Sequence, residues 1–476
     1  MNISQETNIP VDNASVSDKA VKGAYRVPLF TLTTLFFMWG FITCMNDILI
    51  PHLKELFRLN YLESMLVQFC FFGAYFLGSV IYFLLSYHKG DAINKIGYKK
   101  GIMIGLFISA LGCLLFYPAA SFGQYWMFLS ALFILGLGFT LLQITSNVYV
   151  SLLGAPEGAS SRLNLAQAFN SFGTTIAPVI GGAIIFGSAG ESAHISAEAT
   201  KTPYIIFAII FIVASVLIYT VKLPLFTSAE ETKKGLGAWG FPHLRLGVFA
   251  IFCYVGAEVT IGSFMINFLQ QENIMSLPEN IGKNYLAVYW GGAMIGRFLG
   301  SISLSQHLSP FKRIVFMALT SAAVFGLILA LVDLTFEQVS YFIIFLLLNL
   351  AAFIWGRWAA ARTLFIFAAI NIILVTITMF TSGSIAMWTI LSVGLFNSIM
   401  WSNIFTLSIN GLKKYTNQGS SLLIMAILGG ALIPLIQGGL ADWMGIQYSY
   451  ILPVLCYLYI AVFGMYCMRN SSSPGK

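Results

Sequence analysis

The chain carries very little charge. Of its 476 residues, 9% are Asp, Glu, Lys or Arg and 58% are hydrophobic, whereas soluble domains have roughly 25% charged and 45–50% apolar residues. It has only 5 His and 6 Cys, and no pair of cysteines has the spacing of a metal-ligand motif. These shortages exclude a soluble globular protein. We expect no metal site, no cofactor and no framework of disulfides.

Sequence motifs of enzymes are missing too. The chain has no His-Glu-x-x-His, no Walker phosphate-binding loop and no nucleophile elbow, and its histidines lie in loops or at helix ends. The net charge of +7 could suggest a nucleic-acid partner, but the distribution of the charges between loops explains it better. We expect neither an enzyme nor a nucleic-acid-binding protein.

Long apolar segments fill nearly the whole chain. A helix needs about 17–25 apolar residues to cross a bilayer, and segments of about that length follow one another almost without pause. The sequence therefore predicts an all-α, multi-pass membrane protein with about 14 transmembrane helices. The segments are 27–50, 64–86, 101–119, 124–153, 163–188, 202–223, 244–270, 283–305, 312–332, 339–356, 363–381, 384–411, 420–443 and 448–468.

The Lys and Arg residues of the loops indicate how these helices are oriented. If the first helix starts in the cytoplasm, 20 of the 25 Lys and Arg residues fall in cytoplasmic loops and tails, 4 fall outside, and Arg297 lies within a span. Cytoplasmic loops of membrane proteins carry such an excess. We expect both termini in the cytoplasm, with a disordered polar tail over 1–26 and a short tail over 469–476.

Two segments share a pattern of Gly and Pro. Gly173 and Pro178 precede a Gly-Gly pair in the fifth segment, and Gly429 and Pro434 do so in the thirteenth. Two parallel six-helix halves would pair the fifth segment with the eleventh, so we expect a helix pair inserted near 312–356. The predicted domains are a six-helix bundle over 27–223, a cytoplasmic linker over 224–243, and a second bundle with the inserted pair over 244–468. This is the architecture of many secondary transporters.

Only two of the 18 acidic residues fall within apolar spans, Asp47 and Glu258. A charge there costs ~2.5–3.5 kcal/mol on insertion scales, so it is retained mainly where it faces a polar cavity or cycles a proton. Asp47, with Thr43 and Asn46 beside it, either carries the coupling proton or meets water near the end of its helix, before Pro51. Glu258 could bind a substrate hydroxyl, share the proton, or pair with a helix-end cation.

Neutral polar residues form stripes at helical spacing on the fourth and fifth segments. Each stripe faces one direction. Amides both donate and accept hydrogen bonds, which suits a neutral polyhydroxy substrate, although such residues also bond one helix to another. Trp401, near Asn397, is a candidate for stacking on the substrate. The stripes consist of Thr140, Gln143 and Asn147, and of Asn164, Gln167, Ser171 and Thr174.

The loop between the second and third segments reads Gly90-x-x-x-Asn94-Lys95-x-Gly97-Tyr98-Lys99-Lys100. It resembles the inner-loop signature of the major facilitator superfamily, Gly-x-x-x-Asp-Arg-x-Gly-Arg-Arg. Asn94 replaces the usual acid, which weakens the inference of a gating salt bridge. Arg297, in Gly296-Arg297-Phe298-Leu299-Gly300-Ser301, resembles the equivalent edge of the second half. The candidate gating residues are Gly90, Asn94, Lys95, Gly97, Lys99 and Arg297.

Further stretches carry a closer resemblance. They are 46–51, 162–173, 254–258, 396–400 and 419–421. With them, from about residue 28 to 467 apart from the inserted pair, the chain is similar to the fucose–galactose–glucose proton symporter family of the major facilitator superfamily, in its bacterial glucose/galactose branch. The resemblance implies import of a neutral hexose with protons by alternating access, in the bacterial inner membrane.

The resemblance also assigns roles to residues. Asp47 matches a carboxylate that takes part in proton coupling, and Gln167 and Asn170 match sugar-facing positions. Gln143 stands where the fucose branch carries a glutamate, which leaves the stoichiometry and the coupling ion open. The expected proton-coupling residues are Asp47 and Glu258. The expected substrate-binding residues are Asn46, Gln143, Asn147, Gln167, Asn170, Glu258, Asn397 and Trp401.

Two departures from the family pattern concern the substrate. Ser146-Asn147-Val148 stands where relatives tend to have Ala-Asn-Pro, and Trp401-Ser402-Asn403 stands where Phe-Pro-Thr is usual. The substrate could therefore differ from the family default.

Three functions stay open at this point. The first is a proton-coupled importer of glucose or galactose, with fucose and mannose as alternatives. The second is a sodium-coupled sugar transporter, or an exporter of another small polar or amphipathic molecule. The third is a membrane sensor that signals through a partner, for which the short tails offer little surface. The expected partners are a sugar, the coupling ion and the lipid bilayer, with the protein a monomer.

Overall fold

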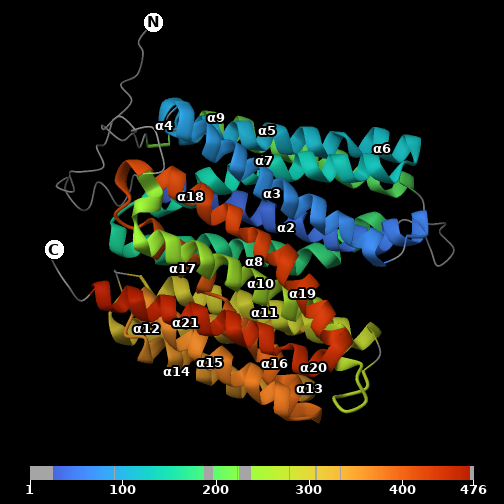
Figure 1. Ribbon diagram of the computed structural model, residues 1–476, viewed down its shortest axis with the longest axis vertical. Helices are drawn as coiled ribbons and strands as arrows, with labels where there is room; N and C mark the ends of the chain where they lie inside the picture. Colours follow the sequence, from blue (N-terminus) through green and yellow to red (C-terminus); the bar gives the residue numbers. More distant parts are fainter. Residues whose placement is uncertain are drawn as a thin grey trace, which may run out of the picture. The chain divides into compact units, whose positions relative to one another are not determined.

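Figure 1 shows the computed structural model of the chain. It describes residues 25–59, 61–89, 92–186, 197–221, 223–224, 237–277, 279–305, 308–332 and 334–471. The side chains of Asn46, Asp47 and Asn94 lie outside this description, as do Gly90, most of the 1–26 tail and most of the 224–243 linker. Within the described ranges every regular element is a helix. Helices are suited to a bilayer because they satisfy their own backbone hydrogen bonds.

Eleven helical spans of the described residues are long and apolar enough to cross a membrane. They are 27–45, 69–88, 98–122, 125–152, 197–220, 242–269, 310–331, 360–380, 383–409, 413–444 and 446–470. The other three expected segments are helical as well, and Phe342–Trp355 is a shorter apolar helix. An all-helical membrane protein is therefore confirmed, whereas the number fourteen is not.

The chain divides into two compact units. Unit 1 consists of 1–159, 176–240 and 410–425, and unit 2 consists of 160–175, 241–409 and 426–476. Each unit thus includes a segment from the sequence half that supplies the rest of the other unit. These segments are the first part of α8 (Ala159–Phe186), in unit 2, and α18 (Thr416–Met425), in unit 1.

Unit 1 is built around α7, which packs on both α3 and α5. α5 also packs on α9, and α18 lies against α3 and α7 (Figure 1). The remaining helices of unit 1 are α2 (Arg26–Phe57), α3 (Tyr61–Lys89), α4 (Ala92–Ile96), α5 (Tyr98–Leu114), α6 (Phe116–Phe122), α7 (Tyr125–Leu152) and α9 (Lys201–Thr220), with short 3₁₀ turns at Pro156–Gly158, Ala197–Thr200, Gly237–Gly240 and Lys413–Tyr415.

Unit 2 repeats part of this packing. α16 packs on α11 and α15, and α15 packs on α21, just as α7 packs on α3 and α5, and α5 on α9. In this comparison α12 and α14 have no counterpart in unit 1, and they occupy the stretch where the sequence predicts the inserted pair. The helices are α10 (Pro242–Leu269), α11 (Glu279–Ser303), α12 (Pro310–Leu331), α13 (Phe336–Val339), α14 (Phe342–Trp355), α15 (Ala360–Phe380), α16 (Gly383–Asn397), α17 (Met400–Ile409), α19 (Gly429–Met444), α20 (Ile446–Ser449) and α21 (Ile451–Ser471), with a 3₁₀ turn at Ala426–Leu428.

Two of the expected helices are interrupted. The segment expected at 384–411 is divided into α16 and α17 by Ser398 and Ile399, and the one expected at 420–443 is divided into α18, a 3₁₀ turn and α19. In α19, Pro434 has no N–H to donate, and Gly429 lies against the backbone of Phe252. Such breaks are tolerated in membrane helices where other groups satisfy the freed carbonyls.

The first helix is longer than expected. α2 continues through Pro51 to Phe57, so Asp47 lies in the interior of the helix and not at its end. Because proline lacks an N–H, the backbone carbonyl of Asp47 has no helical donor four residues later. The helix end expected before Pro51 is therefore not found.

Glycines on α11 bring this helix close to α16. Gly292, Gly296 and Gly300 follow one another at intervals of four residues. A Cβ on Gly292 would lie 3.3 Å from the backbone N of Leu395, and one on Gly296 would lie 2.6 Å from the Leu395 carbonyl oxygen. Small residues permit such close approach of membrane helices.

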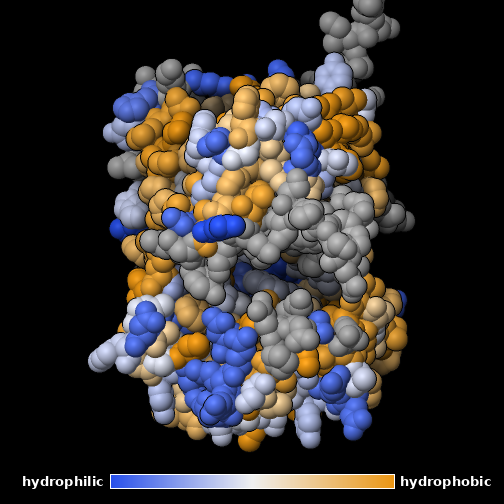
Figure 2. Space-filling model, turned by 90° about the vertical axis from the view of Figure 1, so that its right-hand side faces the viewer, coloured by the Kyte–Doolittle hydropathy of each residue, from blue (hydrophilic) through white to orange (hydrophobic). Residues whose placement is uncertain are grey.

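Hydropathy varies strongly over the surface. In the view of Figure 2, hydrophilic residues are spread over the face at one end of the helices, and hydrophobic residues crowd its margins. Apolar side chains turned outward, such as Phe107, Leu319 and Leu347, are more than half exposed. Such exposure is expected where lipid replaces water as the solvent.

Two glycine substitutions test the close approach. A Cβ on Gly394 would collide with the Tyr289 carbonyl oxygen, whereas one on Gly326 would meet nothing within 4 Å. Overpacking of this kind costs about 1–3 kcal/mol, but alanine gains up to about 1 kcal/mol of helix propensity over glycine. We expect Gly394→Ala to lower the melting temperature in detergent and Gly326→Ala to leave it unchanged or raise it. Equal melting temperatures for the two variants would contradict the packing.

Candidate functional site

Unit 2 contains an ion pair between two of its helices, α10 and α11. The Arg297 Nη2 atom on α11 lies 3.3 Å from the Glu258 Oε1 atom on α10, and the two side chains are 11% and 12% exposed. An unpaired charge in this position would be costly, so pairing is what permits both groups to be buried. Arg297 lies within α11, as the sequence predicts, and the cation that meets Glu258 is therefore not at a helix end.

The Arg297 guanidinium has further partners. Its Nη1 donates to the Ser171 hydroxyl on α8, and its Nε donates to the Ser398 carbonyl at 3.3 Å. A guanidinium presents five N–H donors in a fixed plane, so one side chain can serve several acceptors. Arg297 thereby ties α8, α10 and the junction of α16 and α17 to α11.

The junction between α16 and α17 is held by side chains. The Leu395 carbonyl accepts from the Ser398 hydroxyl at 2.6 Å and from the Asn349 side-chain amide at 3.2 Å. Hydroxyls that bond to a preceding carbonyl compete with the backbone and bend helices. Asn349 is fully buried on α14, so a helix without a counterpart in unit 1 reaches the interruption.

Asn397, just before this junction, is the centre of a polar network. Its Nδ2 donates to the Tyr289 hydroxyl at 3.1 Å, and its Oδ1 accepts from the Tyr457 hydroxyl at 2.7 Å and from the Asn371 amide at 2.9 Å. The Tyr289 hydroxyl donates to the Glu258 backbone carbonyl at 3.1 Å. A side-chain amide has two donors and two acceptor positions, so protein groups already occupy most of the capacity of Asn397.

Trp401 and the α8 amides complete the polar part of unit 2. Gln167 and Trp401 are 6% and 7% exposed, and the indole Nε1 of Trp401 has no hydrogen-bond partner among the described residues. Asn170 is half-buried. Asn164 donates to the Ser160 carbonyl at 2.8 Å, which is a bond within the helix. Buried donors without a protein partner are groups that a ligand can satisfy.

In unit 1 the predicted stripe on α7 is buried. Thr140 donates to the Gly136 carbonyl at 2.9 Å, which is a bond within the helix. Asn147 Nδ2 lies 3.0 Å from the Gln143 carbonyl and 3.5 Å from its Oε1. The Asn147 Oδ1 is buried without a partner among the described residues. Gln143 and Asn147 are thus side by side, as their spacing predicts.

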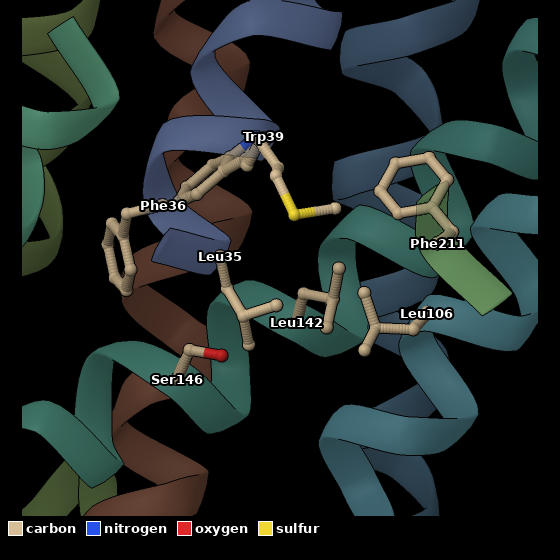
Figure 3. A pocket seen from close by; sticks show the side chains of 8 residues that line it. Leu35, Phe36, Trp39, Leu106, Leu142, Ser146 and Phe211 are labelled. Carbon is tan, nitrogen blue, oxygen red and sulfur yellow. The ribbon is translucent and has the colours of Figure 1, made fainter. Parts of the chain in front are cut away.

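A small pocket lies beside this stripe. Side chains from α2, α5, α7 and α9 meet there, and Trp39, Leu106, Leu142, Ser146 and Phe211 are among them (Figure 3). Apart from the Ser146 hydroxyl and the Trp39 indole, the lining is apolar. The pocket by itself therefore offers a surface on which to stack, and few groups that can bind hydroxyls.

The predicted inner loop is bonded within unit 1. Gly97 has a φ of 84° between α4 and α5, which explains a glycine at that position of the signature. Lys99 donates to the Val221 carbonyl at 3.0 Å, and Lys95 is exposed. The Tyr98 hydroxyl donates to the Asn417 side-chain oxygen on α18 at 2.8 Å. Tyr98 stands where the signature has an arginine, so a neutral hydrogen bond occupies this place.

The predicted residues therefore fall into two groups. Gln143, Asn147 and the backbone of Asn46 and Asp47 belong to unit 1, whereas the predicted residues of α8, α10, α11, α16 and α17 belong to unit 2. Sequence reasoning missed Tyr289, Tyr457 and Asn371. No sequence signal distinguishes these tyrosines from the many aromatic residues of membrane helices, and Asn371 lies in a segment without a polar stripe.

Substitutions of the ion pair test its role in holding unit 2 together. Removing one partner of a buried pair costs about 3–5 kcal/mol, because the other charge is left uncompensated. We expect Arg297→Gln to lower the melting temperature strongly, and the double variant Glu258→Gln, Arg297→Gln to recover part of the loss. If the double variant melts no higher than Arg297→Gln, the pair does not hold the helices as described.

Comparisons with known proteins identify the family of the chain. Residues 30–356 match the sequence profile of the Major Facilitator Superfamily. The "Glucose/galactose transporter" of Brucella abortus is 42% identical over 463 residues, which cover 96% of this chain and 98% of the relative. The "Putative glucose/galactose transporter" of Helicobacter pylori is 38% identical and covers 93% and 97%.

A solved structure agrees as well. A crystal structure of the Escherichia coli fucose:proton symporter FucP superposes with a TM-score of 0.74 at 28% sequence identity, over 93% of this chain and 99% of that one. On these grounds, and with its helical membrane fold, the chain belongs to the major facilitator superfamily.

Proposed function

We propose that this protein is a secondary active transporter that imports a neutral hexose together with protons by alternating access. The observation that carries the proposal is the similarity over nearly the full length to proteins named as glucose/galactose transporters. The solved structure that superposes on this chain belongs to a protein named as a fucose:proton symporter, and this name includes both a proton and a hexose. Glucose or galactose is the proposed substrate, with fucose and mannose as the alternatives.

The geometry supports a neutral substrate. Glu258, the acid of unit 2 that the sequence places within an apolar span, is paired with Arg297. Among the described residues, the buried polar groups without protein partners include the Asn147 oxygen and the Trp401 indole. Neutral donors and acceptors beside aromatic rings suit the hydroxyls and the apolar face of a sugar.

We assign the coupling proton to Asp47, which lies inside α2 and whose backbone carbonyl lacks a helical donor. The ion pair favours a structural role for Glu258 over that of a second proton carrier. The side chains proposed to contact the sugar are those of Asn46, Gln143, Asn147, Gln167, Asn170 and Trp401. Asn397 is proposed to act through its neighbours, because protein groups occupy most of its hydrogen bonds.

Topology is part of the proposal. α8 and α11 have 28 and 25 residues, enough to cross a bilayer, and α13 and α14 together extend over 336–355. With the eleven spans these make fourteen transmembrane helices, in two bundles over 27–223 and 244–468 with both termini in the cytoplasm. The proposed location is the bacterial inner membrane, and the proposed state is a monomer.

The inner loop of unit 1 is proposed to gate the cytoplasmic side. The residues assigned to this role are Gly90, Asn94, Lys95, Gly97 and Lys99, to which we add Tyr98 and Asn417.

Uptake into proteoliposomes tests the function. Labelled glucose, galactose, fucose and mannose are offered with an inward pH gradient in the absence of sodium. The proposal predicts accumulation of glucose or galactose, which stops when the gradient is dissipated. Accumulation only after sodium is added would show that sodium, and not the proton, is the coupling ion. No accumulation of any of the sugars with either ion would refute hexose transport.

Asp47→Asn separates proton coupling from sugar binding. An amide keeps the shape of the carboxyl but cannot exchange a proton, so we expect gradient-driven accumulation of the sugar to fall by at least about 10-fold. Exchange of labelled for unlabelled sugar, which needs no net proton movement, is expected to survive. Asp442→Asn is the matched control, because Asp442 is exposed at the end of α19. Undiminished accumulation in Asp47→Asn would show that another group carries the proton.

A further inference from the structure

A groove runs along α15 on the surface of unit 2. Its floor is formed by Arg362, Ile366, Ala369, Ile370 and Ile373, which follow one another at helical spacing, and Trp355 of α14 and Met468 of α21 flank it. Its volume is about 400 Å³. Ile373 and Trp355 are 58% and 65% exposed, so the groove opens outward.

The length of the groove matches one leaflet of a bilayer. From Arg362 to Ile373, eleven residues of helix extend for about 16 Å, which is roughly half of the ~30 Å hydrocarbon core. The apolar stripe therefore has the length of one acyl chain that enters from one surface of the membrane. Arg362 lies at the end of the stripe, where a headgroup would be.

The arginines at this end are available to a ligand. Arg362 is half-buried and Arg357 is exposed in the turn before α15, and neither guanidinium has a hydrogen-bond or ion-pair partner among the described residues. Arg469 is exposed in the last turn of α21, next to Met468. Arg313 stacks on the Trp358 ring at 5.0 Å, so the first turn of α12 and the turn before α15 lie together.

Apart from Glu258, the acids of unit 2 that can be placed by their contacts lie at the other end of its helices. Glu272 belongs to the turn after α10. In that turn, Asn273 bonds to Gln447 at 2.9 Å, and its carbonyl accepts from the backbone N of Gly383 at 3.0 Å. Glu337 and Asp442 lie in or beside connections at this same end. Among the described residues of unit 2, the groove end thus carries cations and no carboxylate, so an anion is attracted there.

We propose that the groove binds an anionic phospholipid, with the phosphate at Arg362 and one acyl chain along the apolar stripe of α15. Basic pockets between membrane helices on the cytoplasmic side suit anionic headgroups, and the loop charges place Arg357 and Arg362 on that side. A zwitterionic lipid offers the same chain but a compensated headgroup. The site is independent of the transported sugar.

Thermal unfolding of the full-length protein in detergent tests the site. Phosphatidylglycerol and phosphatidylcholine with identical chains are titrated into the wild type, Arg362→Gln and Lys312→Gln. Lys312 is an exposed cation in the first turn of α12 that does not line the groove, so its variant removes the same charge from the same end. We expect phosphatidylglycerol to stabilise the wild type at lower concentration than phosphatidylcholine. Arg362→Gln should raise that concentration at least about 10-fold, and Lys312→Gln less than about 2-fold.

Other results would overturn the proposal. Equal stabilisation by the two lipids would show that the headgroup is not recognised. If Arg362→Gln and Lys312→Gln weaken the binding of phosphatidylglycerol equally, the effect is due to net charge and not to a site at Arg362. Ala369→Trp provides a second route, because it fills the stripe and keeps every charge. It is expected to weaken both lipids, and unchanged binding of phosphatidylglycerol by this variant would contradict a chain in the groove.

Discussion

Unit 2 depends on the burial of one guanidinium. A charge inside a membrane helix is costly unless it is paired or faces a polar cavity, and Arg297 is paired with Glu258 and also donates to Ser171 and to the Ser398 carbonyl. Each partner comes from a different part of the chain. The glycines of α11 bring Arg297 near α16, and the interruption after Asn397 leaves the Ser398 carbonyl free to accept. The ion pair of Arg297, the close packing of α11 on α16 and the interruption between α16 and α17 therefore depend on one another.

The helices α12 and α14 contribute to the same arrangement. α14 is apolar along its length except for Asn349, whose amide bonds to the Leu395 carbonyl at the interruption. Phe342 of α14 contacts Phe325 of α12 and Trp388 of α16. These contacts link the two helices that lack a counterpart in unit 1 to the helix that carries Asn397. The pair therefore does more than cover the edge of the unit.

The sequence predicts the helices well and their partners poorly. Long apolar runs identify membrane helices by themselves, and the spacing of Gln143 and Asn147 correctly places them side by side. The partner of Glu258 is not predictable in this way, because Arg297 lies on another helix and its position resembles a family loop edge. The partners of Asn397, which are Tyr289, Tyr457 and Asn371, are not predictable either, because their convergence depends on tertiary packing. The continuation of α2 through Pro51 likewise overrides a local signal for a helix end.

The central claim is that a sugar and a proton move together, and the most direct measurement follows the proton. The protein is reconstituted into liposomes that contain a trapped pH dye, without sodium and without an imposed gradient, and galactose or glucose is added outside. The account predicts that the lumen acidifies when the transported hexose is added, does not respond to a sugar that is not taken up, and does not respond in Asp47→Asn. Uptake of labelled sugar without any change of internal pH would contradict it.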